Sequence, residues 1–327
     1  MYRKEKSLSM KGSTSALCHN LSVYTDNDKR TQSYGVVHKS VANIITIAAD
    51  GANVLMQRQV IVKEPGGHGS TIVMQMKYCE FPERSLMVMA CQRGIQIYES
   101  DGSVMLYWHS LVNPESNEVS KAYARGICTL QDSMLCIGTD SGTILVFEIP
   151  PKGTNILLKE SLKEHVLPIS CLHSHGLVLA SGDDSGCIIL WRVEESQLHP
   201  YKRIDGLGSP CSGVRLWNEL LVATYGSGHI RLFKVISGHM CAEVTAHARW
   251  INAIDVVHRN GMVLTVSEDS FAKIWQLKEG DAPEIEHLSS ECVQNVLLCG
   301  AAFTHPDGTS FCVTGCDLAE VICFTTK

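Results

Sequence analysis

Short apolar runs alternate with polar turns along most of this chain. Six such runs are "LMVMA", "MLCIG", "LVLAS", "LLVAT", "MVLTV" and "SFCVT". Each is followed, after a polar turn, by a second apolar run such as "GCIILWRV" or "FAKIWQL". All have the length of β-strands, and no long segment with a period of 3.6 residues competes with them. The pattern predicts an all-β protein.

The paired runs recur at a nearly constant interval. Each second run contains an aromatic anchor, and these anchors are 49, 44, 42, 42 and 49 residues apart, at Tyr98, Phe147, Trp191, Phe233, Trp275 and Phe324. Self-similarity at about 40–45 residues, with several short strands in each unit, is typical of β-propeller blades. One such unit cannot bury its own apolar faces, so neighbouring sheets must stack around an axis.

The first 62 residues give a weaker version of the same unit. "ALCHNLSVYT", "SYGVVHK", "NIITIAAD" and "NVLMQRQVIV" read as four short strands. With the six readable repeats in 63–327, they predict a single seven-bladed propeller of four-stranded antiparallel blades over 1–327. A closed ring avoids open sheet edges, so we expect a strand around Leu17–Tyr24 to complete the blade that ends at Phe324. The basic stretch Tyr2–Lys11 is expected to be a solvated tail.

Two stretches near Trp275 resemble the WD-repeat family of β-propellers. They are "AHARWINAIDV", with alanine in place of the family's usual glycine, and "TVSEDSFAKIW". The resemblance implies a buried hydrogen-bonded chain that locks one blade, formed by His247, Thr265, Asp269 and Trp275. His165 and Trp191 hold the first and last of these positions in an earlier repeat. No repeat ends in the literal Trp-Asp pair. Peripheral stretches such as "RGIQIYES" and "VTGCDLAE" resemble one member of the family in particular.

Aspartates recur shortly before the aromatic anchors. Asp140 and Asp184 lie seven residues before Phe147 and Trp191. Acids at one register of different blades are turn-forming groups, because aspartate side chains bond nearby backbone N–H groups. Catalytic carboxylates must converge on one substrate, and acids in separate blades would not do so. A serine nucleophile also needs a positioned base. We therefore expect no enzymatic activity.

One cluster has metal-ligand residue types. In "CLHSH", Cys171, His173 and His175 alternate along a predicted strand and so share one face. Zinc sites usually recruit a second cluster with C-x₂₋₄-C spacing, and the nearest, Cys312-x₃-Cys316, belongs to another repeat. We expect an ordinary strand here, with neither a metal nor a cofactor.

Charge and composition narrow the class of partner. The net charge of −6 does not favour nucleic acid or an anionic membrane. The sequence has neither a signal peptide nor a run of about 18 apolar residues that would span a membrane. We expect a cytoplasmic protein, with nuclear, vesicle-associated and ciliary locations left open, and reduced thiols at its 14 cysteines.

The resulting hypothesis is a non-catalytic scaffold or adaptor that presents loops from a rigid ring, in signalling or in a trafficking or ciliary assembly. The expected partners are proteins or peptides, including basic segments. The candidate contact residues are Arg249, Trp250, Asp184 and Asp140, and the loop Leu111–Ala124 is a candidate for self-association. The alternative is a propeller enzyme, or a small-ligand binder that uses the central channel. Titratable groups with strongly shifted pKa values at one channel mouth would favour that alternative.

Overall fold

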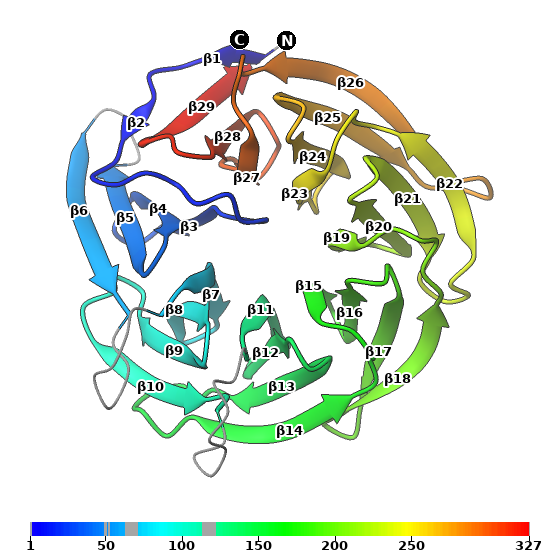
Figure 1. Ribbon diagram of the computed structural model, residues 1–327, viewed down its shortest axis with the longest axis horizontal. Helices are drawn as coiled ribbons and strands as arrows, with labels where there is room; N and C mark the ends of the chain where they lie inside the picture. Colours follow the sequence, from blue (N-terminus) through cyan, green and yellow to red (C-terminus); the bar gives the residue numbers. More distant parts are fainter. Residues whose placement is uncertain (1, 49–50, 52, 63–70, 113–121, 327) are drawn as a thin grey trace.

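The computed structural model describes residues 2–48, 51, 53–62, 71–112 and 122–326. These residues form twenty-nine β-strands, and none of them belongs to a helix that could cross a membrane. The strands make seven antiparallel sheets that stand around one central axis (Figure 1). The prediction of an all-β, seven-bladed propeller is confirmed.

Six blades consist of four strands that are consecutive in the chain, with the first strand innermost and the fourth outermost. Blade 1 consists of β3 (Ser22–Asp26), β4 (Thr31–His38), β5 (Val41–Ala48) and β6 (Val54–Ile61). Blade 2 consists of β7 (Val73–Phe81), β8 (Arg84–Cys91), β9 (Gly94–Glu99) and β10 (Met105–Ser110). Blade 3 consists of β11 (Ala124–Leu130), β12 (Met134–Thr139), β13 (Thr143–Glu148) and β14 (Leu157–Lys163).

The second half of the chain continues the pattern. Blade 4 consists of β15 (Ile169–His175), β16 (Val178–Asp183), β17 (Ile188–Glu194) and β18 (Gln197–Ile204). Blade 5 consists of β19 (Cys211–Trp217), β20 (Leu220–Tyr225), β21 (His229–Lys234) and β22 (Met240–Thr245). Blade 6 consists of β23 (Ile251–Val257), β24 (Met262–Ser267), β25 (Phe271–Lys278) and β26 (Glu284–Cys292). Blade 7 contains β27 (Leu298–Phe303), β28 (Ser310–Gly315) and β29 (Glu320–Thr326).

The position of a strand within its blade follows from how many of its residues are hydrophobic. Every residue of β12 and of β20 is buried, because a neighbouring blade covers each face of these strands. By contrast, β14 and β22 contain no buried residue, because they lie at the outer edge of their blades. The core is divided among seven clusters, one between each pair of adjacent blades. Among the described residues, the cluster between blades 7 and 1 is the smallest.

The ring is closed by the two ends of the chain. β1 (Tyr2–Lys4) and β2 (Leu8–Ser9) both pair antiparallel with β29 and together occupy the outer position of blade 7. The Tyr2 ring lies edge-on to Phe311, with ring centroids 4.9 Å apart, and its hydroxyl donates to the Gly308 carbonyl. An N-terminal strand therefore closes the ring, as expected.

The residues that close the ring differ from those predicted. A strand around Leu17–Tyr24 was expected to complete blade 7, but Ser22–Asp26 forms the innermost strand of blade 1. The stretch Tyr2–Lys11, expected to be a solvated tail, contains the closing strands, and both Tyr2 and Met10 are buried. Burial of these two side chains against blade 7 outweighs the charge of the residues between them.

A β-bulge recurs in the innermost strands. In blades 2 to 7 the register between the first and second strands shifts near the start of the first. The shift leaves a residue without a ladder partner, for example Ser212, Asn252 or Cys299. The carbonyl groups of these residues therefore need other hydrogen-bond donors.

Closure gives a stability prediction. Tyr2→Ala should lower the free energy of unfolding by about 3 kcal/mol, because it removes a buried aromatic ring and the hydroxyl that holds the edge strand. Urea unfolding followed by tryptophan fluorescence measures the change. Arg3→Ala, on the exposed neighbour, should stay within about 0.5 kcal/mol of wild type. If the two variants are equally stable, β1 does not hold the ring closed.

Candidate functional site

One end of the ring carries two sets of loops. They are the connections from each outer strand to the next inner strand, and the turns between second and third strands. We call this end the upper rim and the opposite end the lower end. In the described chain the upper rim includes 10–21, 164–168, 184–187, 205–210 and 246–250.

Four side chains at the upper rim of blade 6 form one hydrogen-bonded chain. The Trp275 indole donates to the Thr265 hydroxyl at 2.9 Å, and Thr265 Oγ1 lies 2.9 Å from His247 Nε2. His247 Nδ1 lies 3.0 Å from an Asp269 carboxylate oxygen, which also accepts the Ala248 N–H. Burial lowers the pKa of His247, so the imidazole is neutral and donates from Nδ1. Against the effect of its own burial, the His247 hydrogen bond lowers the pKa of Asp269 to about 2.

Blade 4 contains an equivalent chain with a different acid. Trp191 donates to Ser181 Oγ at 2.9 Å, and Ser181 Oγ lies 2.7 Å from His165 Nε2. His165 Nδ1 then meets Asp183 Oδ2 at 2.7 Å. The sequence indicates His165 and Trp191 but not Asp183, because the acid that recurs seven residues before the aromatic anchor is Asp184. The buried position of Asp183 at the end of β16 distinguishes it from Asp184.

Asp184 and Asp140 each hold a turn in place. Asp184 Oδ1 accepts from Arg125 at 2.7 Å, which joins blade 4 to blade 3 and compensates the carboxylate charge. The Arg125 guanidinium also donates to the Ile169 carbonyl. Asp140 Oδ1 accepts the backbone N–H of Tyr123, just ahead of β11. Both acids lie at the upper rim, although neither projects as an isolated charge.

Arg249 and Trp250 have different environments although they are adjacent. Arg249 is exposed. Trp250 is half-buried, and its ring packs so closely on blade 5 that a Cβ at Gly226 would come within 2.4 Å of it. The indole nitrogen is buried. Arg249 is therefore available to a partner, whereas Trp250 mainly supports the rim.

The upper rim also exposes apolar side chains that sequence reasoning missed. Val166 is 81% exposed and Leu207 56%, and Leu167 beside Val166 is exposed as well. Exposed acids flank them, with Glu164 next to His165 and Asp205 two residues before Leu207. The signal in the sequence was the pair "VL" directly after His165, inside a connection where an apolar pair has no partner strand.

The segment between β2 and β3 closes the upper mouth of the channel. In Figure 1 this dark-blue segment runs from the edge of the ring toward its centre. His19 N–H donates to the Asn252 carbonyl at 2.9 Å, and its Nε2 donates to the Ser212 carbonyl at 2.9 Å. Asn20 N–H donates to the Cys299 carbonyl. These are the carbonyl groups that the bulges of blades 5, 6 and 7 leave unpaired.

Two features fix the position of this segment. Asn20 bonds the backbone of Val37 through both ends of its amide, at 2.8 and 2.9 Å. A Cβ at Gly300 would lie 2.6 Å from the Asn20 carbonyl carbon, so only glycine permits the approach. Burial raises the pKa of the Cys18 thiol to about 11, and nearby Arg125 and Trp250 only partly oppose this. The thiol is therefore protonated and unreactive.

Below His19 the channel holds a cavity of about 250 Å³. Burial, with a smaller contribution from Arg215, lowers the pKa of His19 to about 3, and the same causes place the pKa of His173 well below its ordinary value. Lys77 donates to the Ile127 carbonyl. Shifted titratable groups do line the channel, but each of these side chains also has a structural hydrogen-bond partner in the wall.

Metal-ligand residue types meet at one place in the described chain. The ligand atoms of His165, Asp183 and Cys187 lie within 4.8 Å of one another. His165 and Asp183 already use these atoms for the hydrogen-bonded chain, and burial raises the pKa of Cys187 to about 11. Both ring nitrogens of His165 are already hydrogen-bonded and the Cys187 thiol is protonated, so this cluster does not suit a cation.

The other metal-ligand candidates from the sequence form no cluster of three ligands in the described chain, although the rings of His173 and His175 both stack on His258. His173 accepts the Leu216 N–H, the Cys171 thiol lies 3.8 Å from that of Cys211, and His175 stacks on His258. In the loop Leu111–Ala124, considered for self-association, residues 113–121 lie outside the described part of the chain.

The blade architecture and the two buried networks define a WD-repeat β-propeller. One solved structure with the same fold is a chain of the structure titled "Crystal Structure of Mitotic Checkpoint Complex". It aligns with a TM-score of 0.76 and 14% identity, over 99% of this chain and 96% of that one.

Sequence comparison is more specific. The family model described as WDR54 matches residues 1–327. A rat protein, "WD repeat domain 54" of Rattus norvegicus, is 40% identical over 334 residues, which cover 99% of each chain. The human "WD repeat-containing protein 54" is 39% identical over 336 residues, covering both chains completely. The chain belongs to the WDR54 family.

The blade 6 network predicts a stability loss confined to its members. Asp269→Ala should lower the free energy of unfolding by about 1–3 kcal/mol, because it leaves the Nδ1–H of the buried His247 without an acceptor. Glu268→Ala, on the adjacent acid, should cost less than about 0.5 kcal/mol. Equilibrium unfolding in urea at neutral pH separates the two. Equal losses for the two variants would mean that these acids affect stability only through the net charge of the protein, and not through the hydrogen bonds of Asp269.

The same carboxylate predicts a pH dependence. Its pKa is about 2 in the folded protein against 3.8 ordinarily, so the unfolded chain binds more protons in this range. The stabilisation is complete above the ordinary value and disappears as the pH falls toward about 2. The stability gap between wild type and Asp269→Ala should therefore narrow over that interval. A gap that stays constant there would contradict ionisation of Asp269 in the network.

Proposed function

We propose that this protein is a non-catalytic scaffold that docks partner proteins on its upper rim. The observation that carries the proposal is the exposure of Val166, Leu167 and Leu207 on loops of adjacent blades. Large apolar side chains exposed on neighbouring loops of a rigid scaffold are typical of interaction sites. Because the ring beneath these loops is rigid, the loops lose little conformational entropy when they bind a partner.

The charges of the rim suggest the chemistry of the partner. Glu164 and Asp205 are exposed beside the apolar residues, and Asp140 is half-buried nearby. Asp184 contributes less, because Arg125 compensates it. A partner segment with apolar residues next to lysine or arginine would match this surface. Arg249 on blade 6 would then contact an acidic or carbonyl group at the margin.

Two cellular roles suit such a docking ring. A signalling adaptor and a subunit of a trafficking or ciliary assembly would both use a rigid surface of this kind. The identities of proteins that depend on the upper rim for binding would decide between them.

A second candidate is a small-ligand binder that uses the channel. The lowered pKa values of His19 and His173 favour it, because neutral imidazoles can accept as well as donate hydrogen bonds. Since Cys18 and His19 close the upper mouth, a ligand would enter from the lower end. Its test is a thermal shift on ligand addition that His173→Phe abolishes.

The rim proposal is tested by a triple variant, Val166→Ser, Leu167→Ser and Leu207→Ser. We expect co-purified partners to fall by about tenfold in quantitative mass spectrometry, because hot-spot contacts carry most of the binding energy. The matched control is Leu177→Ser with Ile236→Ser, which changes exposed apolar residues in hairpins at the lower end. Arg249→Ala alone should give a smaller loss. An identical partner set for the triple variant and the control would refute the proposal.

A further inference from the structure

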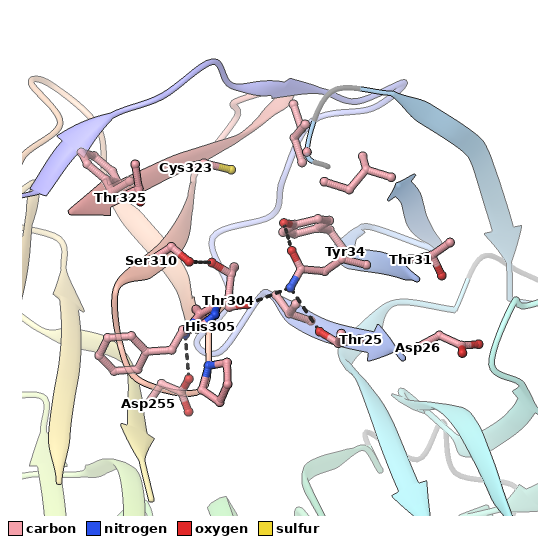
Figure 2. A pocket seen from close by; sticks show the side chains of 18 of the residues that line it. Thr25, Asp26, Thr31, Tyr34, Asp255, Thr304, His305, Ser310, Cys323 and Thr325 are labelled. Carbon is pink, nitrogen blue, oxygen red and sulfur yellow. Dashed lines mark hydrogen bonds between the residues drawn. The ribbon is translucent and has the colours of Figure 1, made fainter. Parts of the chain in front are cut away.

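The contact between the first and last blades is incomplete. A cavity of about 1240 Å³ lies between blade 1 and blade 7, and we call it the closure groove. It is lined by β3, β4 and β5 on one side and by β28, β29 and the loop that follows β27 on the other. Figure 2 shows Thr304 and Ser310 on one wall and Thr25, Thr31 and Tyr34 on the other.

The groove exists because this interface lacks the apolar filling found between the other blades. Its hydrophobic cluster is small and includes Met10, Leu21 and Val321, which lie near the upper rim. Toward the lower end a polar bridge replaces it, since Gln32 Nε2 donates to the Thr304 carbonyl at 2.9 Å and to the Thr25 hydroxyl at 3.2 Å. The walls therefore stay apart below that bridge.

The groove runs inward to the central channel. Val23, Glu80, Asp255 and Phe303 line both cavities, so the two spaces meet at these residues. Its volume exceeds the roughly 300–1,000 Å³ of ordinary small-molecule pockets. A short stretch of extended polypeptide fits such a space better than a metabolite does.

The walls offer what a peptide requires. Phe303 of blade 7 is partly exposed and provides apolar surface for a side chain, and the largely buried side chains of Ile47 and Phe324 also line the wall. Hydroxyl groups that line the groove, among them Thr31 and Thr325, can bond a peptide backbone. Specific sites commonly combine apolar walls with a few such polar groups.

The charged residues at the inner end of the closure groove indicate which peptide side chain would bind there. Glu80 is open to the groove, and no described residue forms a hydrogen bond or ion pair with its carboxylate. Desolvation by its surroundings raises the pKa of Glu80. Asp255, on the other side of the junction, accepts the Phe303 N–H and has Arg215 at 3.7 Å. The unpaired carboxylate of Glu80 gains most from an added cation. The cations that line the groove, Lys6, Arg30 and Arg259, are exposed.

We propose that the closure groove binds an extended peptide segment of a partner, with a lysine or arginine side chain reaching Glu80 and a neighbouring apolar side chain resting against Phe303. The site lies at the lower end and does not depend on the upper rim. A ring of this family would then have two separate docking surfaces.

The test uses the purified full-length chain and four fluorescein-labelled octapeptides in a glycine–serine background. They carry one arginine and one leucine, arginine alone, leucine alone, or glutamate and leucine. Fluorescence anisotropy should rank the arginine–leucine peptide first and the glutamate–leucine peptide last. Glu80→Gln should weaken the best peptide by about tenfold, as expected for loss of one charge-assisted hydrogen bond.

Matched variants make the result decisive. Glu83→Gln, three residues away in the β7–β8 turn, should leave the affinity unchanged. Thr25→Trp, which fills the groove, should abolish binding, whereas Thr154→Trp on an exposed loop of blade 3 should not. The triple rim variant described above should bind the peptide normally. The proposal is overturned if no peptide binds, if the glutamate–leucine peptide binds best, or if Glu80→Gln and Glu83→Gln behave alike.

Discussion

The pairing of β1 with β29 is the interaction on which the rest of the molecule depends. In a closed ring of seven sheets, every blade packs against a neighbour on both sides. Blade 7, the last blade, obtains its outer strand from the other end of the chain. Without that strand, β29 would present an open edge, and the stack would resemble an unclosed repeat array. Tyr2 secures the pairing with a buried ring rather than with strand length, which explains how three residues suffice.

The N-terminal segment has a second role, which is to pair backbone carbonyl groups that have no partner within the sheets. Bulges in the inner strands leave the carbonyl groups of Ser212, Asn252 and Cys299 without ladder partners. His19 and Asn20 supply the missing donors, so one short stretch links blades 5, 6 and 7 across the axis. Buried backbone groups must be paired, and here the pairing converts an open tube into one that is closed at the top.

Much of the fold could be predicted because the sequence repeats the same pattern of short strands from blade to blade. The spacing of Tyr98, Phe147 and Trp191 already indicates blades, and repeated short apolar runs indicate strands. Asp183 could not be separated from Asp184 in this way, since only the buried end of β16 distinguishes them. β1 escaped prediction because three residues rich in charge give no periodic signal. The closure groove depends on how repeats at opposite ends of the chain pack, which no local pattern contains.

The pairing of β1 with β29 has a consequence for the order in which the ring forms. Because Tyr2 pairs with Thr326, this contact spans nearly the whole sequence, and contacts of large sequence separation form slowly. A chain growing on the ribosome holds its first strand unpaired until its last strand emerges. Protection of the β29 edge therefore comes only after all seven blades have been made, and the contact between blade 7 and blade 1 is the last part of the ring to form.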